Sequence, residues 1–152
     1  MAKTIDQDTL ATFRFRAAIP VRWSDYDRLG HINNAKYFTY LEQARIDYFK
    51  EVSQWPWDLY SMVIAHISMD YATPILPGEQ PVVLIKLTQM GTKSFRLENL
   101  IVSDKPGDEV LLYAQAETVL VSLDAQSGQA VAVPEPMRSR MLAYDQLQSA
   151  GA

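Results

Sequence analysis

One long amphipathic helix is the feature that most constrains how this chain folds. Between Tyr37 and Val52, apolar side chains recur at the spacing that places them on one face of a helix. The residues on that face are Tyr37, Tyr40, Leu41, Ala44, Tyr48 and Val52, with Phe38 and Phe49 on its flank. The opposite face carries Lys36, Thr39, Gln43, Asp47 and Lys50. Such a helix must lie on a hydrophobic core, so the rest of the chain has to provide the other layer.

Runs with strand character lie on both sides of this helix. One precedes it at 13–23, where Pro20 indicates an edge, a bulge or a strand end. The others follow it at 61–72, 81–90, 95–103 and 109–123, and 130–133 could add a short last strand. Short turns at 91–94 and 104–108 predict an antiparallel meander. A second helix is expected at about 136–147, because prolines precede it and are tolerated in a first turn.

This order of elements predicts an α+β fold in a single domain that spans residues 1–152. An open antiparallel sheet with one long helix forms a two-layer core when the helix packs on one face. The 152 residues, 48% of them apolar, are enough to bury such a core. Residues 1–12 are polar, and we expect them to be loosely ordered.

Charge and composition argue against several classes of function. The formal net charge of −4 does not favour a general nucleic-acid binder, which needs a basic face. The chain has no cysteine, which excludes disulfides, thiolate ligands and a thiol nucleophile. With two histidines and no ligand cluster, we predict no metal site. No signal-like start and no apolar run of ~18 residues is present, so we expect a cytoplasmic protein without a membrane partner.

A polar loop directly before the long helix contains the candidate catalytic groups. It reads WSDYDRLGHINN, from Trp23 to Asn34. An asparagine at the end of this loop can cap the helix, which should begin within a residue or two of Asn34. Gly30 allows a tight backbone path after Asp27. Because the free N–H groups of a helix start stabilise a carbonyl or anionic oxygen, an acid in front of them suits acyl transfer.

The loop and the helix together contain one composite motif. It is D-x-x-x-H-x-N-N-x-x-Y followed by E-x-A-R, here Asp27, His31, Asn33, Asn34, Tyr37, Glu42, Ala44 and Arg45. This motif resembles that of the hotdog-fold thioesterases of the 4-hydroxybenzoyl-CoA thioesterase type, and the resemblance extends roughly from Phe15 to Leu142. As a composite the motif is fairly specific, whereas an isolated D-x-x-G would be uninformative.

The resemblance implies a fold, a reaction and an assembly. The fold would be a curled antiparallel sheet of about five to six strands wrapped around the long helix, with a short C-terminal helix. The reaction would be hydrolysis of an acyl-CoA to a carboxylic acid and CoA, with no cofactor because the CoA moiety belongs to the substrate. The assembly would be a homodimer or a homotetramer with active sites at the subunit interface.

The resemblance also implies roles for two residues of the loop. Asp27 matches the second acid of a D-x-D pair that begins at Asp25, and it would attack the thioester carbonyl or activate a water. The backbone N–H seven residues later, that of Asn34, would polarise the carbonyl. The structural alternatives are that Asp27 caps the helix or pairs with Arg28, and that Asn34 only caps.

His31 and Glu42 each have two interpretations. The pKa range of histidine suits acid–base catalysis, but His31 could instead make a structural hydrogen bond to the loop. The same run resembles plant-type acyl-carrier-protein thioesterases, although those have a catalytic asparagine where Leu29 stands. Another hotdog branch uses a helix acid, but we interpret Glu42 as the partner of Arg45 in an i, i+3 ion pair.

Three further residues are candidates for substrate binding. Tyr37, with Tyr40 beside it, would line an acyl pocket, unless both are plain core residues. The turn at 91–94 matches the place where the family's turn contacts the CoA phosphates or pantetheine. There Lys93 supplies a charge and Ser94 a hydroxyl, which suits a phosphate, although an ordinary exposed hairpin is the alternative.

Two other functions compete with acyl-CoA hydrolysis. An acyl-carrier-protein thioesterase would use the same chemistry, but an acidic carrier gains little from a chain with net charge −4. A non-catalytic hotdog protein could bind acyl-CoA, but such a binder gains nothing from the carboxylate of Asp27 beside the ligand carbonyl.

The His66, Ser68 and Asp70 series has the residue types of a triad, but neighbours at i, i+2 lie ~6.6 Å apart, too far to pass a proton.

Overall fold

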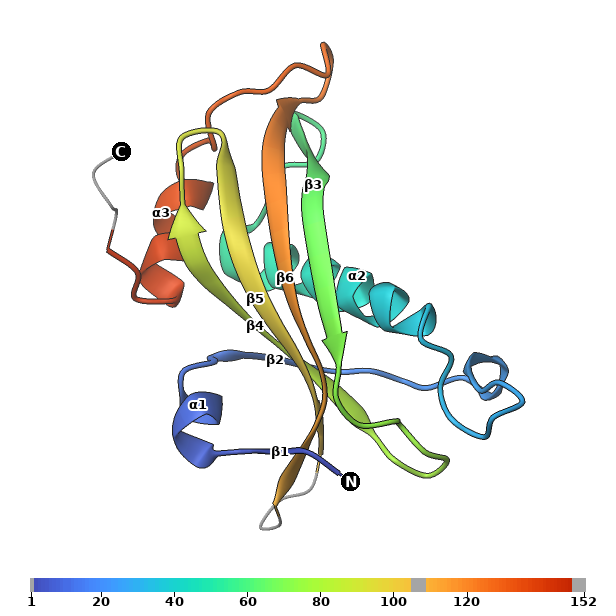
Figure 1. Ribbon diagram of the computed structural model, residues 1–152. Helices are drawn as coiled ribbons and strands as arrows, with labels where there is room; N and C mark the ends of the chain where they lie inside the picture. Colours follow the sequence, from blue (N-terminus) through green and yellow to red (C-terminus); the bar gives the residue numbers. More distant parts are fainter. Residues whose placement is uncertain (1, 105–108, 149–152) are drawn as a thin grey trace.

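One antiparallel sheet and one long helix form the two layers of the fold (Figure 1). The computed structural model describes residues 2–104 and 109–148. Its strands are β1 (Thr4–Ile5), β2 (Phe15–Ala18), β3 (Tyr60–Tyr71), β4 (Pro81–Met90), β5 (Ser94–Ser103) and β6 (Val110–Asp124). Its helices are α1 (Gln7–Ala11), α2 (Lys36–Tyr48) and α3 (Met137–Tyr144), with a 3₁₀ turn at Trp23–Asp25 and a π turn at Phe49–Ser53.

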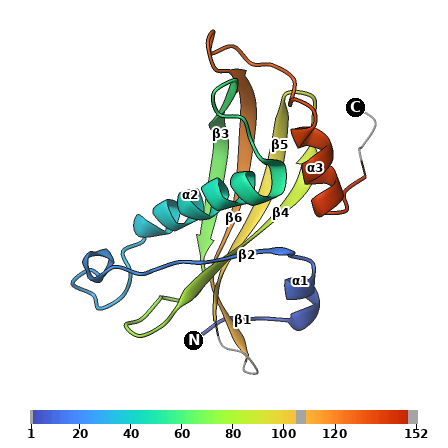
Figure 2. The ribbon, with the colours of Figure 1, turned by 180° about the vertical axis from the view of Figure 1, so that it is seen from behind.

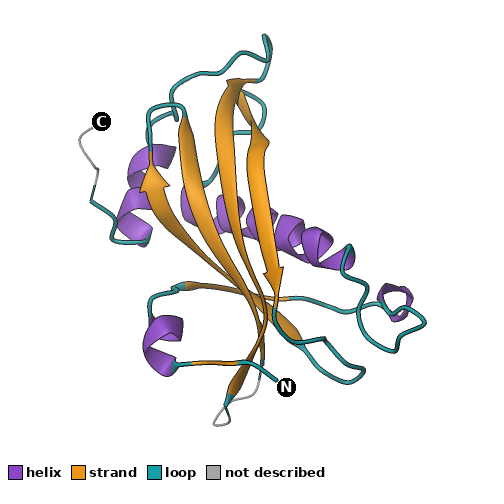
Figure 3. Cartoon of the chain, in the orientation of Figure 1, coloured by secondary structure: helices purple, strands orange, loops and turns teal. Residues whose placement is uncertain are grey.

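The strands follow the order β1-β6-β5-β4-β2, and β3 also pairs with β6 (Figure 3). All pairings are antiparallel, and β3, β5 and β6 share a long ladder. The start of β6 pairs with β1, whereas the remainder of β6 pairs with β3 along the same edge. As a result β3, which has β6 as its only strand partner in the described residues, forms an edge of the sheet.

Helix α2 crosses one face of the curled sheet, as Figure 2 shows from behind. Its buried face is the predicted one, and it packs on the inward side chains of β4 and β5 in the main apolar cluster. Members of that cluster include Leu41, Ala44, Tyr48, Val83, Ile85, Leu97 and Ile101. Each such side chain contributes about 1.5–3 kcal/mol when fully buried. These two layers confirm the predicted α+β hotdog architecture.

The outer face of the sheet has a smaller apolar cluster that the N-terminal segment covers. Leu10 of α1 packs near Phe13, Leu84 and Val102, which lie on the side of the sheet opposite α2. Asp6 caps α1 by accepting a hydrogen bond from the Thr9 N–H at 2.7 Å. In the described part of residues 1–12, the sheet edge and this cluster thus contact the chain, while the expectation of loose order there stays a prediction.

Two other predicted segments differ in the structure, and a third lies partly outside the described residues. The first long strand is shorter than 13–23, because the chain leaves the sheet after Ala18 and enters the 3₁₀ turn. The segment 130–133 forms only an isolated bridge between Leu123 and Ala130. Residues 105–108 of the turn predicted at 104–108 lie outside the described residues.

None of the helices in 2–104 and 109–148 is long and apolar enough to cross a membrane.

Candidate active site

The loop between the 3₁₀ turn and α2 is a small hairpin. Tyr26 and Ile32 pair as an antiparallel bridge. On either side of that bridge, the Asp27 N–H donates to the His31 carbonyl at 3.0 Å and the Asn33 N–H donates to the Asp25 carbonyl at 2.9 Å. The chain reverses at Gly30, whose φ of 83° lies in the left-handed region that favours glycine. The backbone of Asp27 is therefore fixed opposite that of His31.

The carboxylate of Asp27 is held at the turn of this hairpin. Its Oδ1 accepts a hydrogen bond from the Leu29 N–H at 2.8 Å, and the side chain is 25% exposed. Among the described residues, no donor reaches Oδ2, and no ion pair joins Asp27 to Arg28. The pairing with Arg28 that we considered is thus not formed. One oxygen orients the carboxylate, and the other is left for a substrate or a water.

His31 lies beside this acid. Its Nδ1 is 4.0 Å from Asp27 Oδ1 and 3.2 Å from the Ile32 carbonyl oxygen. A proton on Nδ1 would be donated to that carbonyl, which leaves Nε2 as the acceptor in the neutral ring. His31 therefore makes a structural bond to the loop and lies next to Asp27, while its role in acid–base catalysis stays a prediction.

Helix α2 begins at Lys36, two residues after Asn34, as predicted. The Asn33 side chain caps the turn that leads into the helix, because its Oδ1 accepts a hydrogen bond from the Ala35 N–H at 2.9 Å, whereas Ala35 itself, the residue before Lys36, makes no side-chain cap bond. Asp27 does not cap the helix. Within the described part of the chain, the N–H of the exposed Asn34 donates to no protein acceptor. The helix start thus presents an unused main-chain donor together with the positive end of its dipole.

An apolar cavity of about 310 Å³ lies against Asn34. The residues that line it include His31, Ile32, Asn34, Tyr37, Tyr71 and Pro74. The rings of Tyr37 and Tyr71 meet edge to face with centroids 5.0 Å apart, and burial raises the pKa of Tyr37 to about 12. Tyr37 is thus a neutral wall of the cavity, and its contact with an acyl group stays a prediction. Asp27 does not line the cavity and meets it only through its neighbour His31.

Two tyrosines differ from their predicted places. Tyr71, which the strand pattern marked only as an apolar position, donates its hydroxyl to the Asn34 carbonyl at 3.0 Å. Only the tertiary contact between the end of β3 and the start of α2 shows this role. Tyr40 does not line the cavity beside Tyr37, because it lies on the β2 side of α2 and bonds to Asp25.

Lys93 and Ser94 are not brought to the hairpin within one chain. They lie at the turn between β4 and β5, at the opposite end of the sheet from the loop before α2 (Figure 1). The Lys93 carbonyl accepts from the Ser122 N–H at 2.8 Å, which fixes the turn to β6. Strand β3 runs from that end, at Tyr60, to the hairpin end, at Tyr71.

The expectation of an ion pair between Glu42 and Arg45 is wrong. Among the described residues no such pair forms, and Glu42 is exposed. Arg45 is only 6% exposed, and its Nη1 has no hydrogen-bond partner there. Desolvation lowers the pKa of Arg45. The i, i+3 spacing allowed the pair, but the packing of α2 directs the guanidinium inward.

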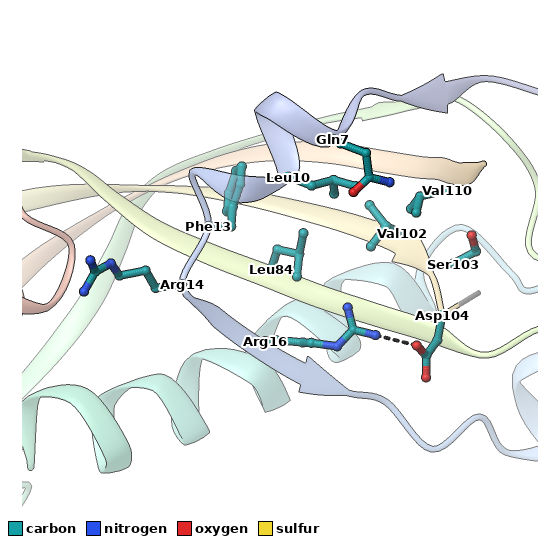
Figure 4. A pocket seen from close by; sticks show the side chains of 10 residues that line it. All are labelled: Gln7, Leu10, Phe13, Arg14, Arg16, Leu84, Val102, Ser103, Asp104 and Val110. Atoms are coloured by element: carbon teal, nitrogen blue, oxygen red, sulfur yellow. Dashed lines mark hydrogen bonds and ion pairs between the residues drawn. The ribbon is translucent and has the colours of Figure 1, made fainter. Parts of the chain in front are cut away.

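A separate cavity of about 450 Å³ lies on the outer face of the sheet (Figure 4). It is bounded by Leu10, Phe13, Leu84 and Val102, and by the ion pair of Arg16 with Asp104. None of the predicted site residues lines it. The candidate site is therefore the hairpin, the start of α2 and the cavity beside them.

Comparison with known proteins relates the chain to thioesterases. The profile of the Thioesterase-like superfamily matches residues 21–141. The chain is 29% identical over 137 residues to the uncharacterized protein YsmA of Bacillus subtilis, covering 90% of each chain. It is 27% identical over 126 residues to the long-chain acyl-CoA thioesterase FadM of Escherichia coli, covering 81% of this chain and 93% of FadM.

Among solved structures, a thioesterase from Thermus thermophilus in complex with coenzyme A and Zn is similar to this chain. The two are 32% identical, with a TM-score of 0.73, and the alignment covers 89% of this chain and 97% of the other. The matched profile, over residues 21–141, includes the hairpin and α2 within its span.

Proposed function

Because the chain belongs to the Thioesterase-like superfamily, we propose that it is an acyl-CoA thioesterase that releases a carboxylic acid and CoA. Its similarity to a long-chain acyl-CoA thioesterase and to a thioesterase that binds coenzyme A supports a CoA ester as substrate. The narrower assignment to the 4-hydroxybenzoyl-CoA type stays a prediction from the motif.

The observation that carries this proposal is that one loop contains both a carboxylate oxygen without a hydrogen bond, Asp27 Oδ2, and a main-chain donor without an acceptor, the Asn34 N–H, among the described residues. In our proposal the thioester carbonyl accepts from the Asn34 N–H, and Asp27 Oδ2 attacks the carbonyl carbon or removes a proton from an attacking water. Negative charge develops on the carbonyl oxygen, the C–S bond breaks, and the thiolate leaves and takes up a proton. With water as the nucleophile the carboxylic acid is released directly. After attack by Asp27 the acyl group stays on Asp27 as a mixed anhydride, which a water then hydrolyses to free the acid and restore the carboxylate. A donor of this kind contributes about 2.7–4 kcal/mol to transition-state stabilisation.

His31 has a supporting role in this proposal. Its ring lies within 4.0 Å of Asp27 Oδ1 and lines the cavity where the acyl group would sit. The imidazole can therefore exchange a proton with the carboxylate or with the departing thiolate. Tyr37 and Tyr71 would form the wall against the first carbons of the acyl group.

We further propose that a second copy of the chain completes the site. The outer edge of β3 is unpaired in the described residues, and Val63, Ile64 and Tyr71 on it are 49%, 40% and 46% exposed. A two-fold axis that pairs β3 with a second β3 reverses the strand. The Lys93 end of one chain then lies beside the hairpin end of the other, where Lys93 and Ser94 could bind the CoA phosphates.

Arg45 is a second observation in favour of such a dimer. On α2 it lies about 20° from Phe38, which is 41% exposed. A buried guanidinium without an acceptor is costly, and an acceptor from a second copy would remove that cost. Two-fold assembly through the β3 side of α2 would cover both residues.

Thiol release from acyl-CoAs of increasing chain length, with benzoyl and phenylacetyl esters included, tests the proposed activity. We expect hydrolysis by the wild type and a loss of at least ~100-fold in Asp27→Asn, which corresponds to about 2.7 kcal/mol. Asp6→Asn is the matched control, because Asp6 also accepts from a backbone N–H but lies at the start of α1. Its activity should stay within about twofold of the wild type.

The alternative functions have distinct outcomes in this assay. Binding of acyl-CoA by both proteins without thiol release would favour the non-catalytic binder. Thiol release only from acyl-carrier-protein thioesters would favour an acyl-carrier-protein thioesterase. Full activity in Asp27→Asn would contradict the catalytic role assigned to Asp27.

A further inference from the structure

Asp25 is a buried acid at the base of the hairpin. The residue is 4% exposed, and its Oδ2 accepts two hydrogen bonds, from the Tyr40 hydroxyl at 2.6 Å and from the Arg22 N–H at 3.0 Å. Its carbonyl accepts a third bond, from the Asn33 N–H at 2.9 Å. Asp25 therefore joins the segment that enters the hairpin, the segment that leaves it, and the second turn of α2.

The hydrogen bond between Asp25 and Tyr40 is stable, because its donor stays protonated and both residues are buried. Tyr40 is 4% exposed, and burial, with the hydrogen bond to Asp25 as a second cause, raises its pKa far above the ordinary value. The phenol thus remains protonated and able to donate. A short O–H···O⁻ bond that is shielded from water is among the stronger hydrogen bonds in proteins, and a buried carboxylate that lost its donor would be poorly solvated.

The location of this bond relates it to Asp27. Asp25 and Asp27 lie on the same arm of the hairpin, with the bridging Tyr26 between them. Their backbone bonds to Asn33 and His31 are the two that flank the bridge. The hydrogen bonds of Asp25 consequently fix the position of the segment from Asp25 to Asp27, which is the first strand of the hairpin. The position of Asp27 depends on that segment.

We propose that Asp25 and Tyr40 are positioning residues that hold the Asp27 carboxylate at the reacting carbon. This inference rests on the proposed function. The pair touches neither the proposed acyl cavity nor the reacting atoms, and it acts through the hairpin alone. Displacements of about 1 Å in a reacting group are enough to slow a reaction by about 10²-fold, so a small relaxation of the arm should lower kcat.

Tyr40→Phe tests the proposal, because it removes one hydroxyl and keeps the ring. We expect kcat to fall by about 10- to 100-fold with KM within about twofold, since the substrate contacts stay in place. The same substitution in an Asp27→Asn background should cause no further fall, because the residue through which it acts is already lost. An equal fall in both backgrounds, or no fall in the wild type, would overturn the proposal.

Tyr48→Phe provides a matched control on the same helix. The Tyr48 hydroxyl also donates to an aspartate, the half-buried Asp145, whose Oδ2 accepts at 2.8 Å, but it lies at the end of α2 remote from the hairpin. Loss of this hydroxyl should change the unfolding midpoint while kcat stays within about twofold. A fall in kcat equal to that of Tyr40→Phe would mean that the effect is general destabilisation, and the proposal would be wrong.

Amide hydrogen exchange separates this proposal from the proposed function. In Tyr40→Phe, the amides of Asp27 and Asn33 should exchange at least ~10-fold faster, whereas that of Ile85 in β4 should keep its rate. This measurement needs no substrate, so it is decisive even if the wild type hydrolyses no thioester. Unchanged exchange at both hairpin amides would overturn the positioning role whatever the enzyme assay shows.

Discussion

The two ends of α2 differ in what surrounds them. At the C-terminal end, Phe49 is almost fully buried, and its ring lies 5.5–6.1 Å from four aromatic neighbours. At the N-terminal end, Asn34 is exposed and its N–H has no acceptor in the described chain, while Asp27 keeps one unbonded oxygen. The difference indicates that the sealed C-terminal end provides stability, and the open N-terminal end is where the proposed catalytic groups lie.

Phe49→Ala should produce the largest loss of stability at the sealed end. Removal of a fully buried aromatic side chain costs about 3–5 kcal/mol, because transfer energy and contacts are both lost. Denaturant unfolding measures this loss, and thiol release measures the activity of the fraction that stays folded, which should be unchanged. Trp23→Ala, at an aromatic residue 91% exposed near the open end, should cost under ~0.5 kcal/mol. Equal losses in the two variants would contradict the comparison.

Asn33→Ala should have an intermediate effect at the open end. It removes the side-chain acceptor for the Ala35 N–H, and the loss of such a cap costs about 1 kcal/mol. Asn34→Ala removes no side-chain hydrogen bond among the described residues and should cost under ~0.5 kcal/mol. The free energies of unfolding of both variants, measured side by side, test which asparagine is the cap. A larger loss in Asn34→Ala would reverse the assignment.

Asp145 allows a smaller test of the sealed end, through pH. Burial raises the pKa of this carboxyl above 3.8, so the native state favours the protonated form more than the unfolded state does. The stability from this proton is fully present below about pH 3.8 and is lost as the pH rises through the raised pKa. Unfolding of the wild type and of Asp145→Asn between pH 3.5 and 7 measures it. The stability of the wild type relative to the variant should fall with rising pH, and a constant difference would be evidence against the shift.

The sequence predicted those features that depend on local periodicity. The buried face of α2 and the ranges of β4 to β6 follow from apolar spacing, because each of these elements buries side chains along its length. Position at a sheet edge is not a local property. The run at 61–72 predicted a strand, but not that β3 would be an edge strand with a bulge after Ile64, on which Val63 and Ile64 are substantially exposed.

The candidate site was predictable only in part, for the same reason. Asp27 and His31 come from one short segment, and a local hairpin is sufficient to place them opposite each other. Asn34 is related to them only through the cavity that it lines together with His31. The bond from Tyr40 to Asp25 depends on how α2 packs over the chain that enters the hairpin, which no spacing reveals. The distance of Lys93 from the loop likewise depends on the direction of β3, and the inward Arg45 on the packing of α2.

The unused donor at position 34 has a consequence for how the protein can vary. In the proposed mechanism the group that polarises the carbonyl belongs to the main chain, so almost any amino acid except proline supplies it. Substitution at this position would alter the surface of the protein while the chemistry persists. The amino acid at residue 34, at the entrance of the cavity, can therefore vary during evolution. Residue 27 cannot vary in the same way, because in the proposed mechanism its side chain takes part in the reaction.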